Sequence, residues 1–223
     1  YPRYRAAQLA QTFDRLPGFA RRALAGGFWS KLPVSVEQKT FRRRLQRLLL
    51  ALNMPPRERY VRWCAIFDDA RKHALYAPDL RARFDALPSW RIFDAEYDKV
   101  PEADFLGQTM FADYQRYLPD DLNAKVDIAS MAHSLECRAP FLDHRLVEFV
   151  ATLPTAFKLR GGQGKRLMRR AFRDLLPPEI LRREKMGFGV PIAEWFRGEL
   201  KDYVRDALLD PTALGRGYFA EEA

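Results

Sequence analysis

Apolar residues recur at helical spacing along almost the whole chain, and the alternation typical of β-strands is nearly missing. After Ser35, phenylalanine and leucine fall at steps of three and four with arginines opposite them, until Pro55 and Pro56 interrupt the pattern. Ser35 and Gln38 have the spacing of a capping box, so a helix is expected to begin there. The pattern predicts a mainly helical protein.

Further helices follow from the same periodicity, with prolines and glycines between them. They are expected through Tyr60–Phe67, at 69–77, 79–86, 101–118, 120–134 and 165–176, and at the end through Trp195–Leu208. Residues 88–99 are predicted to be irregular, and Pro119 is expected to end the helix before it. The segment 135–142 reads as an extended connector, after which Asp143 can cap a helix that closes at Pro154. Gly161, Gly162 and Gly164 indicate a turn.

Helices without a sheet admit two explanations. The chain could be a self-contained bundle, or the helical wing of an α/β enzyme whose strands lie upstream. The start at Tyr1, without an initiator Met, favours a piece of a longer polypeptide. In the second case some helices would expose apolar faces, and self-association would be expected.

Charge adds a second class of function to consider. The 223 residues include 38 Lys and Arg against 29 Asp and Glu, a net charge of +9, and polybasic helices can bind nucleic acid. The arginines at 42–47 are interrupted by core-type leucine, however, and no exposed aromatic residues accompany them. Apolar runs are too short to span a membrane. Cys64 and Cys137 lie in apolar surroundings and are expected to be buried free thiols in a reducing cytoplasm.

Two segments carry candidate chemistry. Lys185 stands in a glycine-punctuated loop, where a mobile ammonium beside an approachable backbone suits a polyphosphate, although a plain surface turn would look the same. The run from Glu136 to Asp143 mixes charged and small residues in a stretch expected to be buried. Its charges could form an internal network that clamps two helices or could take part in catalysis. The common metal, P-loop, hydrolase and dinucleotide motifs are absent from the sequence.

Three blocks of sequence closely resemble the C-terminal part of glutamine-hydrolysing asparagine synthetases. They are "YLPDDLNAKVDIASMAHSLECRAPFLDHRLVEF" (117–149), "KLRGGQGKRLMRRAF" (158–172) and "LRREKMGFGVPIAEWF" (181–196). The resemblance implies a mainly α fragment, residues 1–223, of an α/β synthetase domain of the adenine-nucleotide α-hydrolase type, with its parallel sheet mostly upstream. The glutaminase domain, the S-G-G-x-D-S pyrophosphate loop and the Mg²⁺-binding acids would also lie upstream.

The resemblance also implies the chemistry of the whole protein. ATP and Mg²⁺ would activate aspartate as an acyl-adenylate, and ammonia released from glutamine would convert it to asparagine. Lys185 would contact the phosphates as the catalytic residue. Further residues carried over from the family are those of the ammonia passage and its supporting segment, Glu136, Cys137, Arg138, Ala139 and Asp143, and those of the ATP-site wall, Asp127, Lys165, Arg169 and Gly187. None of them is expected to bind a metal.

Some positions depart from the commoner family pattern, namely Ile128, Cys137, Glu184 and Met186. A related amidotransferase or cyclase that acts on another carboxylate is therefore an alternative, and a basic helical nucleic-acid-binding module is a remoter one. We expect a cytoplasmic enzyme whose partner is the upstream part of its own chain, which could form a homodimer, and which binds no nucleic acid or membrane. The fragment alone is expected to be inactive.

Overall fold

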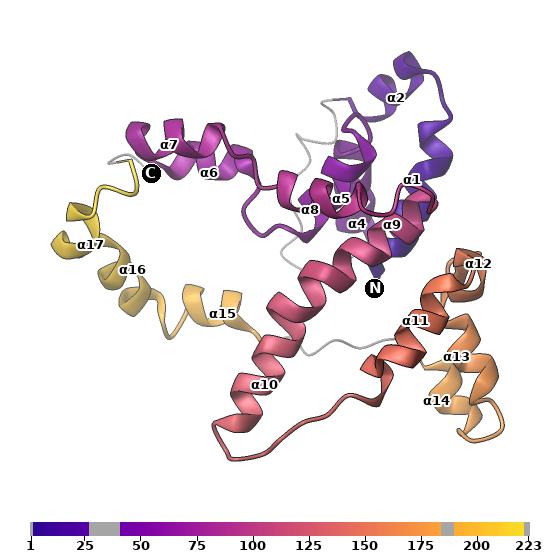
Figure 1. Cartoon of the computed structure of the whole chain (residues 1–223). Coiled ribbons are helices and arrows are strands. Elements are labelled where there is room, and N and C mark those ends of the chain that lie inside the picture. Colours follow the sequence, from indigo (N-terminus) through magenta and orange to yellow (C-terminus); the bar gives the residue numbers. More distant parts are fainter. Residues whose placement is uncertain (1, 27–40, 184–189, 221–223) are drawn as a thin grey trace. The chain divides into compact units, whose positions relative to one another are not determined.

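A computed structural model describes residues 2–26, 41–183 and 190–220 (Figure 1). The chain forms two compact units, one made of Tyr1–Ala65 and Trp90–Asp174 and the other of Ile66–Ser89 and Leu175–Ala223. Within the described residues the strands are two residues long and everything else that is regular is helical. The prediction of a mainly helical fragment is thereby confirmed.

The first unit begins with helices that enclose its core. These are α1 (Pro2–Asp14), α2 (Gly18–Leu24), α4 (Phe41–Leu50), α5 (Pro56–Cys64), α8 (Arg91–Tyr97) and α9 (Phe105–Ala112). Small residues of α1 and leucines of α4 pack around Tyr60 and Trp63 of α5. The predicted capping box at Ser35 and Gln38 lies outside the described residues.

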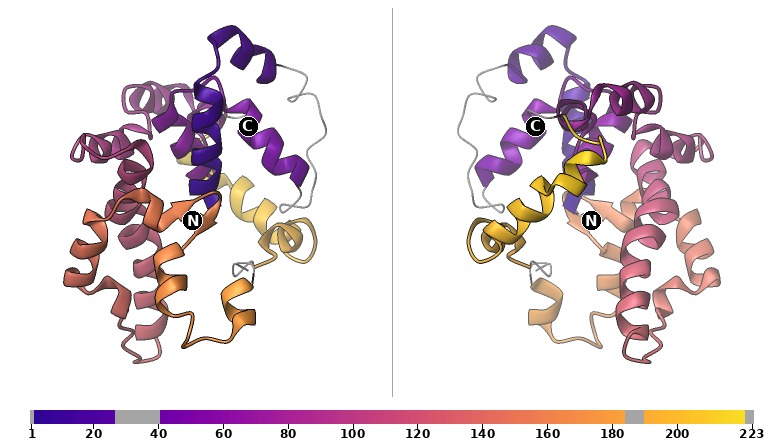
Figure 2. Two further views of the ribbon diagram at one scale, coloured as in Figure 1. Left: turned by 90° about the vertical axis from the view of Figure 1, so that its right-hand side faces the viewer. Right: turned by 90° about the vertical axis from the view of Figure 1, so that its left-hand side faces the viewer.

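A long helical rod leads from α9 into the rest of the first unit. After α9 come a π-helix (Asp113–Asn123), α10 (Ala124–Met131), a short 3₁₀ turn (Pro140–Leu142), α11 (His144–Thr152), α12 (Thr155–Lys158), β1 (Leu159–Arg160), β2 (Gln163–Gly164) and α13 (Arg166–Ala171). Figure 1 shows α9, the π-helix and α10 as one continuous rod. Figure 2 draws the antiparallel β1–β2 pair as arrows.

Three boundary predictions were wrong. Residues 88–99 are not irregular, because α8 forms there and buries Glu96 and Tyr97. Pro119 does not end its helix but lies inside the π-helix, whose wider turn tolerates the missing N–H and the ring. Asp104, rather than Pro101, marks the start of α9, since its carboxylate accepts a hydrogen bond from the Gly107 N–H at 2.7 Å.

Glu96 joins α8 to the π-helix through a buried charge. Its side chain is 1% exposed, and its carboxylate accepts hydrogen bonds from Arg116 Nη2 at 2.5 Å and from Lys99 Nζ at 2.6 Å. Next to it, Tyr97 and Thr109 share a buried hydrogen bond of 3.0 Å. The bond from Lys99, opposed by burial and reinforced by Arg116, lowers the pKa of Glu96 below its ordinary value.

Acid is therefore expected to weaken the first unit through Glu96. Because the pKa is lower in the folded state, the ionised carboxylate stabilises the fold above its unfolded pKa of about 4.3, and this stabilisation is lost as the pH falls through the lower folded value. Urea midpoints measured between about pH 6 and pH 3 should fall more steeply for the wild type than for Glu96→Gln. Equal slopes would contradict the assignment.

The second unit combines two separate stretches of sequence. It contains α6 (Asp69–Leu75), α7 (Pro78–Asp85), α14 (Pro178–Arg182), α15 (Ile192–Arg197), α16 (Lys201–Leu209) and α17 (Pro211–Gly215). The predicted closing helix is divided at Gly198 into α15 and α16. Tyr76 and Phe219 form an isolated β-bridge, with hydrogen bonds from Ala77 N to Tyr218 O at 3.0 Å and from Ala220 N to Leu75 O at 2.9 Å.

Large apolar side chains remain exposed on the later helices of the first unit. On α10, which was expected to face a core, Val126, Ile128 and Met131 are 50%, 70% and 53% exposed. This agrees with helices that would cover a further layer, and self-association stays a prediction. No described helix has the length and apolar character needed to cross a membrane.

Candidate functional site

Residues 136–141 are exposed, and Leu142 and Asp143 are partly buried, so the expected burial of the run from Glu136 to Asp143 was wrong. Residues 135–139 are extended backbone, and Pro140–Leu142 form a short 3₁₀ turn. Arg138 Nε donates to Glu136 Oε1 at 2.7 Å, and these side chains are 86% and 65% exposed. Side chains two positions apart lie on the same side of an extended chain. The charges thus form a local pair rather than a clamp between helices.

Asp143 caps α11, as predicted. Its Oδ1 accepts a hydrogen bond from the Arg145 N–H at 3.0 Å, and Oδ2 accepts one from Arg145 Nη2 at 2.9 Å. The side-chain bonds of Arg145 lower the pKa of Asp143. The carboxylate therefore stays ionised and fixes the direction in which α11 leaves the connector.

One aromatic contact attaches this segment to α13. Phe141, in the 3₁₀ turn, meets Phe172 edge to face with ring centroids 6.4 Å apart. The predicted glycine turn forms between β1 and β2, where Gly161 and Gly162 have φ of +56° and +73°. Arg166 at the start of α13 donates to the Ala156 carbonyl at 2.8 Å. The connector's last residues, the hairpin and α13 therefore form one group.

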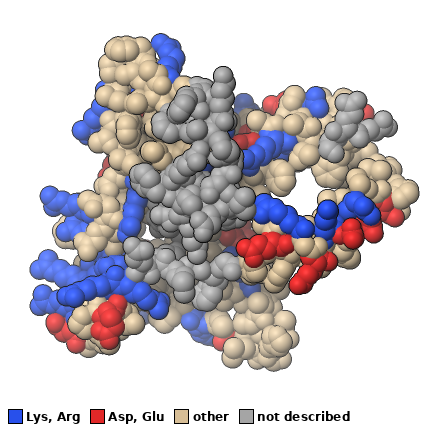
Figure 3. All heavy atoms as spheres, turned by 180° about the vertical axis from the view of Figure 1, so that it is seen from behind, with Lys and Arg blue, Asp and Glu red and all other residues tan. Residues whose placement is uncertain are grey.

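The basic residues of α13 are oriented by its first turn. Lys165 precedes the helix in a left-handed conformation with φ of +57°, and its carbonyl accepts the Arg169 N–H at 2.9 Å. Figure 3 shows Lys and Arg side chains gathered at several places on the face that it draws. Lys165 is exposed and Arg169 is partly buried, and together they place two positive charges at the start of α13, which suits an anionic ligand.

Other predicted site residues are not brought to this group. Asp127 lies exposed on α10, and within the described part of the chain no hydrogen bond or ion pair joins it to α13 or to the connector. Lys185 and Gly187 lie outside the described residues. Among residues 2–26, 41–183 and 190–220, no three His, Cys, Asp or Glu side chains are placed to hold a metal ion, so these residues offer no donor set for Mg²⁺.

The cysteines differ from each other, and the expected burial of Cys137 was wrong. Both thiols are free, but Cys137 and Ala139 are exposed on the connector, whereas Cys64 is half-buried. Burial raises the pKa of the Cys64 thiol to about 11, and the nearby Arg3 only partly opposes this. Cys64 is therefore a neutral thiol at neutral pH.

Alkylation should distinguish them. With iodoacetamide at pH 7.5, Cys137 is expected to react at least about tenfold faster than Cys64, because burial restricts access to Cys64 and raises the pKa of its thiol. Peptide mass spectrometry after timed quenching measures the two rates. Cys137→Ser serves as the control that leaves the slow phase alone, and equal rates in the native protein would contradict the assigned burial.

Sequence reasoning missed a buried polar cluster in the first unit. Asp113 is 1% exposed, and its Oδ2 accepts hydrogen bonds from Tyr60 at 2.5 Å and Tyr4 at 2.8 Å. Arg3 approaches the same oxygen at 3.8 Å. The signal was present, since Asp113 continues the buried stripe of Leu106 and Thr109 at steps of three and four.

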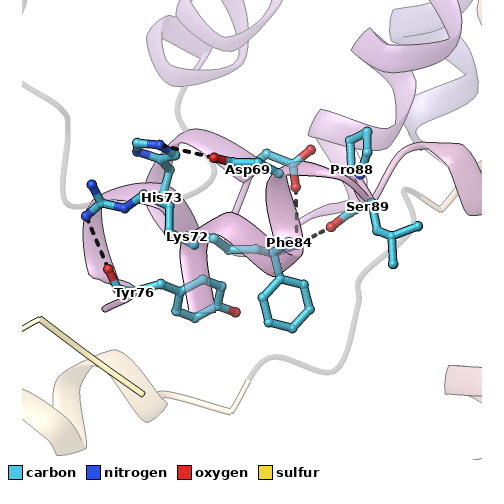
Figure 4. A pocket seen from close by; sticks show the side chains of 10 residues that line it. Asp69, Lys72, His73, Tyr76, Phe84, Pro88 and Ser89 are labelled. Carbon is cyan, nitrogen blue, oxygen red and sulfur yellow. Dashed lines mark hydrogen bonds and ion pairs between the residues drawn. The ribbon is translucent and has the colours of Figure 1, made fainter. Parts of the chain in front are cut away.

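A second missed feature is a small cavity of about 90 Å³ in the second unit (Figure 4). Four of its titratable groups form two pairs, Lys72 with Asp69 at 3.3 Å and His73 with Asp85 at 3.6 Å, and Arg81 Nη2 donates to the Tyr76 carbonyl at 3.1 Å. Lys72 also donates to Ser89. The cavity is lined by an internal polar network that connects α6, α7 and the following turn, and its charges already have partners.

A family model and individual relatives of known name point to the same protein family. The sequence profile of the asparagine synthase family matches residues 1–223. Glutamine-hydrolyzing asparagine synthetase 1 of Bacillus subtilis (strain 168) is 28% identical over 211 residues, which are 93% of this chain and 31% of that protein. The glutamine-hydrolyzing asparagine synthetase of Gallus gallus is 43% identical over 108 residues, 44% of this chain and 19% of that protein.

The matches bear on only part of each relative, because the chain spans less than a third of the length of these proteins. No solved structure matches the chain. The profile nevertheless runs through every segment described above, including the connector, the hairpin and α13. The chain therefore belongs to the asparagine synthase family.

Proposed function

We propose that this chain supplies the helical C-terminal part of an ATP-dependent enzyme that converts aspartate to asparagine. The observation that carries the proposal is the family match over residues 1–223. Relatives named as glutamine-hydrolyzing asparagine synthetases support the same reaction. In the proposal the nucleotide-binding sheet, the Mg²⁺ ligands and the glutaminase domain belong to the full-length protein outside these residues.

The proposed reaction has two steps. A carboxylate oxygen of the aspartate side chain attacks the α-phosphorus of ATP, so that pyrophosphate leaves and an acyl-adenylate forms. Ammonia then attacks the activated carbonyl carbon, AMP leaves with the bridging oxygen, and the amide nitrogen loses a proton. Bound Mg²⁺ would neutralise the pyrophosphate. Positioning and charge neutralisation account for such catalysis.

Residues of this chain have distinct parts in the proposal. Lys185 would hold its ammonium against the phosphates, and Gly187 would let the loop approach them. The turn that carries Lys165 and Arg169 would support the wall of the ATP site, together with Asp127. Glu136, Arg138 and Asp143 would brace the connector, whose exposed Cys137 and Ala139 would line the ammonia passage once another part of the full-length protein covers them.

Isotope transfer tests the reaction directly. Full-length protein is supplied with ATP, Mg²⁺, ammonium and aspartate labelled with ¹⁸O in its side-chain carboxylate. We expect asparagine, AMP and pyrophosphate in equal amounts, with one ¹⁸O per AMP. Glutamine in place of ammonium tests the nitrogen source, and glutamate in place of aspartate is the control. Unlabelled AMP would contradict the adenylate.

One observation favours a second acceptor. Ile128, Cys137, Glu184 and Met186 depart from the commoner family pattern. Product formation from another carboxylate, with aspartate inert, would support a related amidotransferase or cyclase. The isolated 223-residue chain is expected to form neither product, because its sequence contains no S-G-G-x-D-S loop.

A further inference from the structure

The group formed by α12, the β1–β2 hairpin and α13 joins the core of the first unit at one buried residue. Leu159 is 4% exposed and belongs to the same apolar cluster as Leu106 of α9. Among the described residues it is the one member of that cluster from the segment 155–171. A group held at one point can still turn about that point. Its orientation therefore depends on a second contact.

The second contact is a hydrogen bond between α12 and the start of α9. Thr155 Oγ1 donates to Asp104 Oδ1 at 2.9 Å, and Thr155 lies four residues before Leu159 in the chain. The same carboxylate oxygen accepts the Gly107 N–H at 2.7 Å and so caps α9. Because Asp104 is fixed by its own helix, the threonine hydroxyl meets an acceptor of defined position.

Two neighbours of this bond fit a close approach of α12 to α9. A Cβ at position 107, where glycine has none, would lie 3.2 Å from Asp104 Oδ1 and 3.7 Å from Thr155 Oγ1. Lys158 of α12 is partly buried; burial lowers its pKa, and the negative charge of Asp104 opposes that lowering. Asp104 therefore attracts α12 through its charge as well as through the hydrogen bond.

The bond reaches the basic residues of α13 through α12 itself. Ala156 follows Thr155 directly, and its carbonyl accepts a hydrogen bond from Arg166 Nη1 at 2.8 Å. Arg166 is adjacent to Lys165, whose carbonyl accepts the Arg169 N–H at 2.9 Å. A continuous chain of contacts thus runs from α9 to the start of α13.

We propose that Asp104 and Thr155 are positioning residues, which set the orientation of the start of α13 by holding α12 against α9. The inference rests on the proposed function, in which Lys165 and Arg169 support the wall of the ATP site. Without the threonine hydroxyl, the group can turn about its buried leucine and displace these two cations from the nucleotide. Because the cations would act on bound ATP throughout the reaction, affinity for ATP should suffer more than the rate at saturation.

An isosteric substitution tests the bond in the full-length protein. Thr155→Val removes the hydroxyl but keeps the branched shape and the cap of α9. Calorimetry with Mg²⁺ present is expected to show ATP binding weakened about fivefold, the effect of losing one hydrogen bond. The rate of asparagine formation at saturating ATP should stay within about twofold of the wild type.

A rescue variant and a matched control show whether the effect belongs to this hydroxyl. Thr155→Ser restores the donor, so its affinity for ATP should lie within about twofold of the wild type. Thr152→Val makes the same change in α11, where the Thr152 hydroxyl donates to the Phe149 carbonyl of its own helix at 2.8 Å. It should change neither the affinity nor the rate.

Hydrogen exchange followed by mass spectrometry reads the contact without ATP. In Thr155→Val the amides of residues 156–171 are expected to exchange at least about threefold faster, because one of the contacts that fasten this group to α9 is lost. Exchange in α5, which lies in the core, should stay at the wild-type rate.

The outcomes separate this inference from the proposed function. An unchanged affinity for ATP in Thr155→Val, unchanged exchange at 156–171, or a loss that Thr155→Ser does not restore would each overturn the inference. A full-length protein that binds ATP and forms no asparagine would contradict the proposed function instead, and the affinities of the variants would still decide the role of Thr155. Absence of ATP binding by the wild type would overturn both.

Discussion

Asp113→Ala is expected to lower the free energy of unfolding of the first unit by about 3 kcal/mol. The wild-type carboxylate is 1% exposed and accepts the hydroxyl hydrogen bonds of Tyr4 and Tyr60. Alanine would leave both hydroxyls buried without that acceptor and would remove the negative charge 3.8 Å from the Arg3 guanidinium. A buried hydroxyl that loses its acceptor cannot bond to water instead. Removing the acceptor therefore costs more than breaking an exposed hydrogen bond.

Urea denaturation followed by tryptophan fluorescence measures the loss, because Trp63 lies in the same core. Asp120→Ala is the matched control, since Asp120 lies exposed on the same π-helix, and it should change the free energy by less than about 0.5 kcal/mol. Asp113→Asn should fall between the two, because the amide still offers one oxygen acceptor. A loss below about 1 kcal/mol for Asp113→Ala would show that Asp113 is not the centre of the cluster.

Lys185→Ala in the full-length protein is expected to reduce asparagine formation by at least about 100-fold, the effect of removing one preorganised charge from a developing anion. Lys185 lies outside the described residues, so the expectation rests on the proposed function and on the lysine's place in the glycine-punctuated block at 181–196. Hydrolysis of glutamine should continue, because the proposal assigns that step to another domain.

The matched control is Lys201→Ala, at an exposed lysine of α16. It should leave both rates within about twofold of the wild type. Lys185→Arg separates charge from geometry, because a guanidinium keeps the charge but not the compact shape of the ammonium. A loss of less than fivefold in Lys185→Ala would remove this residue from the phosphate site.

Local chemistry made parts of the fold predictable from sequence. Asp143 caps its helix because an Asp before a periodic segment can satisfy a free N–H within two residues. Gly161 and Gly162 turn the chain because glycine, which has no Cβ, adopts positive φ without a steric cost. These features depend on neighbours in sequence, and the sequence displays such neighbours directly.

Other features depend on partners far along the chain. Helix α8 forms in a stretch that reads as irregular because Glu96 is held by Arg116 and Tyr97 by Thr109. Likewise the burial of the Glu136–Asp143 run was overestimated. Apolar residues in a sequence indicate that a segment can be buried, but they do not identify the segment that would cover it. The candidate site shares this limit. Lys165 and Arg169 come together at the start of α13, but Asp127, which was predicted to lie with them, is not joined to that helix by any hydrogen bond or ion pair among the described residues.

The bridge between Tyr76 and Phe219 determines when the second unit can be completed during synthesis. The two stretches of the second unit are separated by residues 90–174. Helices α6 and α7, with Tyr76 between them, therefore leave the ribosome long before Phe219, the bridge partner of Tyr76. Closing so long a loop costs entropy that only the finished contacts repay. The first unit, whose pieces are completed earlier, can fold while α6 and α7 still wait, and this interval is when their apolar residues are open to chaperones.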